Sequence, residues 1–95
     1  MRKIYIVMGY TGEYSSRSEW MVAAYFDKGL AESRAASCDR VASEAHAKCG
    51  RYGGGNWSKD PELAPRIEAV DPHMEIDYTG TSYAVSEVDI VDAQI

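Results

Sequence analysis

Hydrophobic and polar residues alternate in two short stretches near the N-terminus, residues 3–8 and 20–26, and the alternation predicts two β-strands. The first stretch is apolar on both of its faces, with Ile4, Ile6 and Met8 on one face and Tyr5 and Val7 on the other. Because both faces are apolar, we expect this strand in the middle of a sheet. Residues 83–90 show the pattern of a third strand.

Between the second and third strands the apolar spacing changes to three and four residues, which is typical of a helix. Asp27 is suited to the N-cap and Gly50 to the position just past the end, so we predict a helix from Lys28 to Lys48 or Cys49. The apolar stripe expected to face the sheet consists mostly of small residues, namely Leu30, Ala31, Ala35, Cys38, Val41, Ala42, Ala45 and Cys49. Residues 60–70 contain two prolines, which leaves a short helical turn and an extended edge segment as alternatives.

The predicted element order, β-β-α-β, indicates an α+β fold in a single domain covering residues 1–95. A hairpin makes the first two strands antiparallel, and a right-handed crossover through the helix returns the third strand parallel to the second. The simplest arrangement is a three-stranded antiparallel sheet in the order 2-1-3, with one long helix packed on one face.

This topology places three loops at one end of the sheet, residues 9–19, 50–58 and 71–82. The first loop is longer than a hairpin turn requires and is rich in polar and aromatic residues. Loops held by a rigid scaffold commonly form binding sites. We therefore predict a binding site formed by Tyr10, Thr11, Glu13, Tyr14, Arg17, Glu19, Asp77, Tyr78 and Thr79.

The tripeptide Tyr-Thr-Gly occurs twice, at residues 10–12 and 78–80. The repeat has two interpretations. It forms two walls of a binding site, or it marks two turns in which Gly12 and Gly80 supply a positive φ. The sequence leaves both open.

Arg17 lies among groups that attract a guanidinium. It is placed to form ion pairs with Glu13 and Glu19, or to stack on Tyr14 or Trp20. Exposed ion pairs contribute only about 0–1 kcal/mol, so such a set would order the loop weakly.

The formal net charge of −5 is unevenly distributed along the chain. Residues 60–95 carry nine acidic residues and one basic residue, a charge of −8, whereas residues 1–59 carry +3. Such an acidic flank disfavours direct binding to nucleic acid and suits a partner with a basic surface. We predict an acidic surface that includes Asp71, Glu75, Glu87 and Asp89. The alternative is that these charges only maintain solubility and protect an edge strand.

The sequence favours binding over catalysis. Cys38 and Cys49 would lie about 16 Å apart along one helix, beyond disulfide reach. His46 and His73 lack the further ligands of a usual zinc site, and glycines 53–55 lack the Gly-Lys-Ser/Thr of a phosphate loop. We therefore predict no enzyme activity, no metal and no cofactor.

No apolar run approaches the roughly 20 residues of a membrane span. The N-terminal residues lack the length and the cleavage site of a signal peptide. We therefore expect a cytoplasmic protein, in a bacterial host, that does not bind a membrane.

Two groups of motifs resemble a family of small phage- and prophage-encoded proteins. They are Lys3-Ile4-Tyr5-Ile6-Val7, Thr11-Gly12-Glu13-Tyr14-Ser15, Glu19-Trp20, Val22-Ala23-Ala24 and Asp27 before Ala31-Glu32, then Asp71-Pro72, Asp77-Tyr78-Thr79-Gly80-Thr81, Tyr83 and Glu87-Val88. The resemblance covers residues 3–32 and 71–90. It implies a phage accessory role but supplies no activity, because members of the family are generally uncharacterised.

These observations predict a phage or prophage accessory protein that binds another protein, either from the host or from the phage, with a basic surface. One such role is inhibition of a host defence complex, such as a CRISPR effector, by an acidic surface that imitates nucleic acid. The alternative is a domain that binds a small or nucleotide-like ligand between the two Tyr-Thr-Gly loops. A homodimer also stays open.

Overall fold

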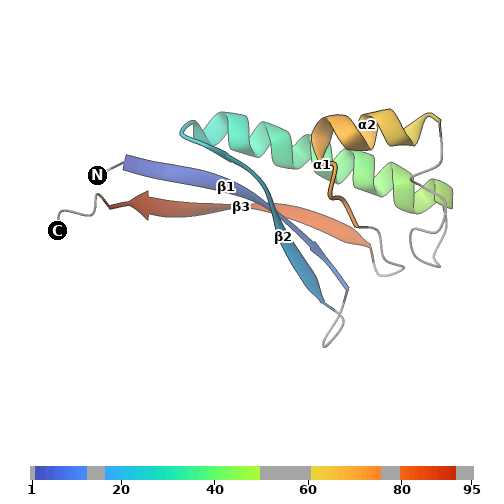
Figure 1. The fold of residues 1–95 in the computed structure, drawn as a ribbon, viewed down its shortest axis with the longest axis horizontal. Helices are drawn as coiled ribbons and strands as arrows, with labels where there is room; N and C mark the ends of the chain where they lie inside the picture. Colours follow the sequence, from blue (N-terminus) through green and yellow to red (C-terminus); the bar gives the residue numbers. More distant parts are fainter. Residues whose placement is uncertain (1, 13–16, 50–60, 76–79, 92–95) are drawn as a thin grey trace.

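The computed structural model describes residues 2–12, 17–49, 61–75 and 80–91, and in α1 the side chains only as far as residue 47. Figure 1 shows a three-stranded sheet with two helices along one of its faces. The elements in chain order are β1 (Arg2–Thr11), β2 (Ser18–Tyr25), α1 (Lys28–Cys49), α2 (Leu63–Val70) and β3 (Thr81–Ile90).

The predicted sheet topology is confirmed. The strand order is β2-β1-β3, and β1 is antiparallel to both neighbours. The chain crosses from β2 to β3 through the two helices, so both helices lie on the same side of the sheet (Figure 1). The fold is therefore α+β, with one layer of sheet and one layer of helix.

Strands β1 and β2 extend further toward their connection than the sequence pattern indicated. Thr11 pairs with Ser18 and Tyr10 pairs with Glu19, so these residues belong to the strands. The prediction of a loop over residues 9–19 was wrong in its bounds, because the ladder of backbone hydrogen bonds continues beyond the apolar alternation. The connection itself covers residues 12–17.

A β-bulge in β2 decides which of its side chains face the helices. Val7 pairs with Ala23, whereas the next residue of β1, Met8, pairs with Met21. Val22 is therefore the extra residue, and a bulge of this kind shifts the alternation of the strand by one position. As a result Trp20 and Tyr25, which strict alternation would place on opposite faces, both pack against the core on the helix side.

Helix α1 begins where the sequence predicted. The Asp27 carboxylate accepts a hydrogen bond from the Leu30 backbone N–H at 3.0 Å, which makes Asp27 the N-cap. Most of the predicted stripe is buried, namely Ala31, Ala35, Cys38, Val41, Ala42 and Ala45. Leu30 was wrongly included: it is 57% exposed, because it lies one residue away from the line of buried positions. The side chain of Cys49 lies outside the described part of α1.

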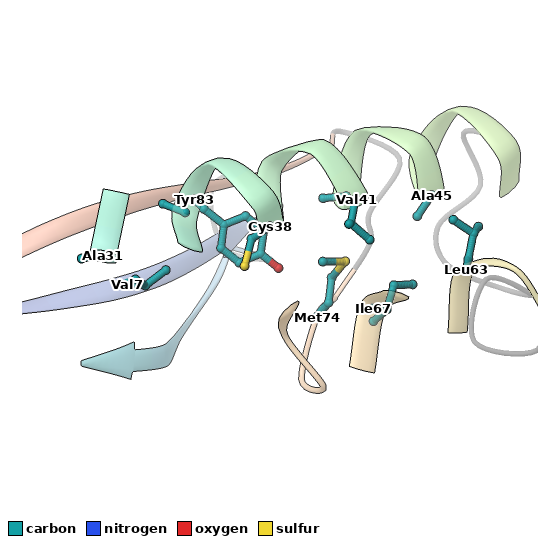
Figure 2. Packing of buried hydrophobic residues seen from close by; sticks show 11 residues of the cluster. Val7, Ala31, Cys38, Val41, Ala45, Leu63, Ile67, Met74 and Tyr83 are labelled. Carbon is teal, nitrogen blue, oxygen red and sulfur yellow. The ribbon is translucent and has the colours of Figure 1, made fainter. Parts of the chain in front are cut away.

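The open question about residues 60–70 is answered by helix α2. Pro65 is its third residue, where the backbone N–H has no partner inside the helix and proline is tolerated. Leu63 and Ile67 are buried in the cluster that also contains Val41 and Ala45 of α1 (Figure 2). Helix α2 therefore packs on α1 and completes the core.

The core lies on the helix side of the sheet, and the residues that α1 contributes to it are mostly small. Val7 of β1 is fully buried beneath α1, while Met74 and Tyr83 fill the space near α2 (Figure 2). Of the eleven buried apolar residues in the described ranges, four are alanines of α1. Small residues on a helix allow it to approach a sheet closely.

Candidate functional site

Asp71 lies in the interior, so its predicted place on an acidic surface was wrong. The residue is 0% exposed and immediately follows α2. Its Oδ2 accepts hydrogen bonds from Trp20 Nε1 at 2.8 Å and from Tyr83 Oη at 2.7 Å. Its Oδ1 accepts one from the backbone N–H of His73 at 3.0 Å. A buried carboxylate is tolerated when such donors replace water.

This hydrogen-bonded group joins the helical layer to the sheet. Trp20 comes from β2 and Tyr83 from β3, and their rings meet edge to face with centroids 6.1 Å apart. Burial, together with the hydrogen bond to Asp71, raises the pKa of Tyr83. Burial, reinforced by the charge of Asp71, raises the pKa of Cys38 to about 11. The Tyr83 hydroxyl and the neighbouring Cys38 thiol are therefore neutral. The hydrogen bonds to Asp71 stabilise the fold.

Two charged residues of α1 that the sequence did not single out complete this region. Arg34 donates from Nε to the Val70 carbonyl at 2.6 Å and from a terminal nitrogen to Tyr25 Oη at 3.1 Å. Asp39 accepts a hydrogen bond from the Tyr83 backbone N–H at 2.9 Å, which covers part of the outer edge of β3. Both residues flank the buried stripe of α1, and this position in the helical pattern is the sequence feature that could have identified them.

The described parts of the two Tyr-Thr-Gly motifs are neighbours, as the topology predicted, and they fit the turn interpretation. Gly12 has φ +83° and Gly80 has φ +96°, values that favour glycine. Thr11 is buried and donates its hydroxyl proton to the Gly80 carbonyl at 2.9 Å, so this predicted binding residue is engaged inside the fold. Thr81 donates to the Glu75 carbonyl at 2.6 Å.

Other predicted site residues fall outside the described residues, so their placing stays a prediction. They are Glu13, Tyr14, Asp77, Tyr78 and Thr79. The same holds for the loop of residues 50–58.

Tyr10, Arg17 and Glu19 form a cluster at one end of the hairpin, in which Arg17 and Glu19 are exposed and Tyr10 is half-buried. The predicted ion pair is present, with Arg17 Nε 3.9 Å from Glu19 Oε1 and both side chains more than half exposed. The Arg17 guanidinium lies 5.4 Å from the centre of the Tyr10 ring. It does not stack on Trp20, because the bulge directs that ring toward the core.

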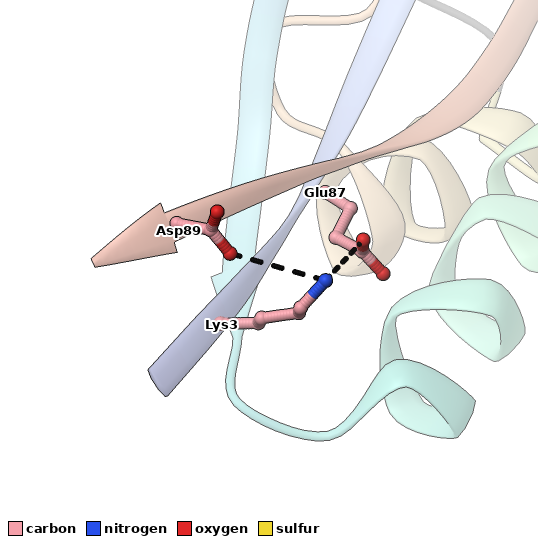
Figure 3. A network of polar contacts seen from close by, with 3 residues as sticks. All are labelled: Lys3, Glu87 and Asp89. Carbon is pink, nitrogen blue, oxygen red and sulfur yellow. Dashed lines mark hydrogen bonds and ion pairs between the residues drawn. The ribbon is translucent and has the colours of Figure 1, made fainter. Parts of the chain in front are cut away.

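Two of the predicted acidic residues share one cation on the helix side of the sheet. Lys3 Nζ lies 2.8 Å from Glu87 and 3.9 Å from Asp89 (Figure 3). The hydrogen bond with Glu87 raises the pKa of Lys3, and the same bond lowers the pKa of Glu87. Glu75 is exposed. Because Asp71 is buried and Lys3 pairs with Glu87 and Asp89, the acidic surface is smaller than the sequence predicted.

The face of the sheet opposite the helices is largely apolar, and we call it the open sheet face. Its apolar members follow from the pairing register and are Ile4, Ile6, Met8 and Tyr10 of β1, Met21 and Ala24 of β2 with Phe26 just beyond, and Ala84, Val88 and Ile90 of β3. Met21 is 70% exposed, Phe26 60% and Val88 44%. Among the described residues, α1 packs on the other face and α2 packs on α1 (Figure 1).

Cations lie over aromatic rings at the two ends of the open sheet face. The Arg2 guanidinium is 4.4 Å from the centre of the Phe26 ring at one end, and Arg17 covers Tyr10 at the other. In the sequence, the apolar character of both faces of residues 3–8 indicated only the central place of this strand. A single helical layer covers only one face of a sheet. This fact predicts an exposed apolar face on the other side, and it was missed.

Within the described ranges no three His, Cys, Asp or Glu side chains lie close enough together to hold a metal ion. None of the described helices has the length and apolar character needed to cross a membrane.

No protein-family model matches this sequence, and neither a curated protein nor a solved structure matches it.

Proposed function

We propose that this protein acts by binding another protein and that the open sheet face is its binding surface. The observation that carries the proposal is the exposure of Met21, Phe26 and Val88 on one continuous face. Large contiguous apolar patches are uncommon on monomeric proteins and mark interaction sites. Isolated exposed apolar residues would need no such explanation, but Met21 and Val88 flank Met8 and Ile4 of the central strand β1 on this face, and Phe26 follows directly after β2.

The dimensions of the face suit a protein partner. A strand of ten residues, such as β1, is about 33 Å long, and three strands at a spacing of about 4.8 Å cover roughly 14 Å. The projected area is therefore roughly 450 Å², and the accessible area of ridged side chains is larger than the projection. The projected area alone is more than half of the about 800 Å² that each partner contributes to a standard interface.

The residue types also favour protein recognition. Aromatic, methionine and arginine side chains are enriched at interfaces, and this face offers Phe26, Tyr10, Met21 and Arg2. Methionine adapts its shape to a partner because its side chain is unbranched and polarisable. The two arginines already lie over rings at the ends of the face, where they would form a polar rim.

The biological setting that we propose is the phage or prophage accessory role that the resemblance implies. A protein that acts by binding fits the inhibition of a larger host complex. The acidic residues Glu87 and Asp89 lie on the helix side, so any contact with a basic partner there would be separate from the open sheet face.

Photo-crosslinking in cells tests the binding surface. A benzoylphenylalanine at position 88 should form protein adducts, and Phe26→Lys should reduce their yield at least about tenfold by placing a charge in the apolar contact. The matched control is the same probe at position 32, which is exposed on α1. Equal adduct yields at positions 88 and 32, or adducts insensitive to Phe26→Lys, would show that the open sheet face is not the binding surface.

A further inference from the structure

We infer that the occupant of the open sheet face is a second copy of this chain, packed face to face about a two-fold axis. The inference rests on the proposed function, because it names the partner of the same surface. Two sheets that pack in this way lie about 10 Å apart, with their side chains interdigitated. The two-fold axis we assign is parallel to the sheet plane and perpendicular to the strands.

The charges on the face support pairing with itself. The described acids Glu87 and Asp89 lie on the helix side, so the net charge of −5 is not concentrated on the open sheet face. Arg2 lies at one end of β1, opposite Ile90, and Glu19 lies beside the other end, opposite Tyr10. The two-fold rotation therefore brings Arg2 of each copy over Glu19 of the other.

Glu19 has room for this second cation. Its existing partner, Arg17, contacts Oε1 at 3.9 Å, and the glutamate side chain is 53% exposed. A carboxylate accepts two guanidinium contacts through its two oxygens. Each copy would thus supply one carboxylate between its own Arg17 and the Arg2 of its partner.

Side-chain sizes along β3 favour the same orientation. At one end its open-face residues are small, Ser82 and Ala84, and at the other end they are large, Val88 and Ile90. Rotation about the assigned axis places the large end of each β3 over the small end of the other. Alternation of large and small side chains is what allows two layers to interdigitate. An axis along the strands would instead place Val88 over Phe26.

The size of the domain gives a reason for such a dimer. In the described part of the chain, α1 contributes four alanines to the core on the helix side, and the largest fully buried apolar side chains there are Val7 and Cys38. A small domain with one modest core is marginally stable. Two open faces joined together would form a second core. The area buried on both copies together would approach the about 1,200–2,000 Å² of stable interfaces.

Sedimentation equilibrium of the full chain tests the dimer. Over roughly 1–200 μM, a range that spans ordinary protein association, the wild type should reach twice the chain mass of 10.5 kDa. Met21→Lys should weaken association at least roughly 100-fold, because each interface would bury two unpaired ammonium groups. Leu30→Lys is the matched control, since Leu30 is 57% exposed on α1 and should leave the dimer intact. Far-UV circular dichroism establishes that each variant is folded.

Charge exchange tests the orientation. Arg2→Glu and Glu19→Arg should each weaken the dimer, and the double variant should restore most of the lost association. A double variant that is no stronger than either single variant would overturn the assigned axis.

The outcomes separate this inference from the proposed function. A chain that stays monomeric at 200 μM while its position-88 probe captures another protein would overturn the dimer and support the binding surface. A monomer whose probe captures nothing would overturn both. A dimer equally sensitive to Met21→Lys and Leu30→Lys would place the interface elsewhere and overturn the inference.

Discussion

The buried carboxylate of Asp71 provides the sharpest test of how the two layers of this fold are joined. Asp71→Ala removes the common acceptor of the Trp20 indole N–H and the Tyr83 hydroxyl. Asp71→Asn keeps one carbonyl oxygen for these two donors. Its amide nitrogen then faces the His73 backbone N–H, which needs an acceptor.

The magnitudes follow from the number of donors left without a partner. A buried donor that loses its acceptor costs about 1–3 kcal/mol. Asp71→Ala leaves the indole, the hydroxyl and the His73 backbone N–H unpaired, so we expect a loss of about 3–9 kcal/mol in the free energy of unfolding. Asp71→Asn leaves one donor unpaired and should cost about 1–3 kcal/mol. A domain of this size has only about 5–15 kcal/mol in total.

Urea unfolding followed by far-UV circular dichroism measures these losses. All variants are compared at one protein concentration, because self-association would make the stability concentration-dependent. With a slope of about 1–3 kcal/mol per molar, a loss of about 3 kcal/mol lowers the urea midpoint by about 1–3 M. Glu75→Ala, at an exposed acid a few residues along the chain, should change stability by less than about 0.5 kcal/mol.

Two results would refute this reasoning. One is a cost of Asp71→Ala within about 0.5 kcal/mol of that of Glu75→Ala. The other comes from a double-mutant cycle with Trp20→Phe, which removes the indole donor. Because the two groups share a hydrogen bond, their coupling energy should exceed about 0.5 kcal/mol, and additive costs would contradict the contact.

Further predictions concern the same side of the sheet. Gly9→Ala should destabilise by about 1–3 kcal/mol, because its Cβ would lie 2.4 Å from Cε2 of the Trp20 ring; a urea midpoint equal to that of the wild type would contradict this contact. The Cys38 thiol, with a pKa of about 11, should react slowly with an aromatic disulfide at pH 8. In a Cys49→Ser background we expect its rate in the native chain to be about 100-fold lower than in the urea-unfolded chain. Equal rates would exclude the burial of this thiol. The raised pKa of Tyr83 predicts that stability falls above pH 10, the ordinary tyrosine value, because the unfolded chain loses that proton while the native chain keeps it. Tyr83→Phe should make this alkaline decline shallower in urea titrations, and an unchanged slope would assign it to other groups.

The sheet order and the start of α1 could be predicted because they depend on local patterns. Alternation identified the strands, and Asp27 marked the N-cap that the structure shows. The bulge at Val22 could not be predicted, because its neighbours are apolar on both sides of the strand. A shift of one residue in such a stretch leaves no trace in the hydrophobic pattern.

Asp71 was misplaced because charged residues usually lie at the surface. Its burial depends on donors that are distant in sequence: Trp20 is 51 residues away and Tyr83 is 12. Only the tertiary structure brings these donors together. The same dependence explains why Thr11, predicted to contact a partner, instead donates to Gly80.

The open sheet face was present in the sequence but was not recognised. Ile4, Ile6 and Met8 were identified as one face of a central strand, and the single long helix was assigned to one side. Together these two predictions already left an apolar face without a cover. The exposure of Met21 and Phe26 depended on the bulge and became visible only with the pairing register.

The central claim, that the open sheet face binds protein, is tested most directly by one comparison of crosslinking yields in cells. The probe is placed either at position 21, where the native side chain is 70% exposed on the open sheet face, or at position 30, where it is 57% exposed on α1. We expect discrete protein adducts from position 21 in at least about tenfold higher yield than from position 30. Similar yields from the two positions would contradict the claim, because they would show that exposure alone accounts for the contacts.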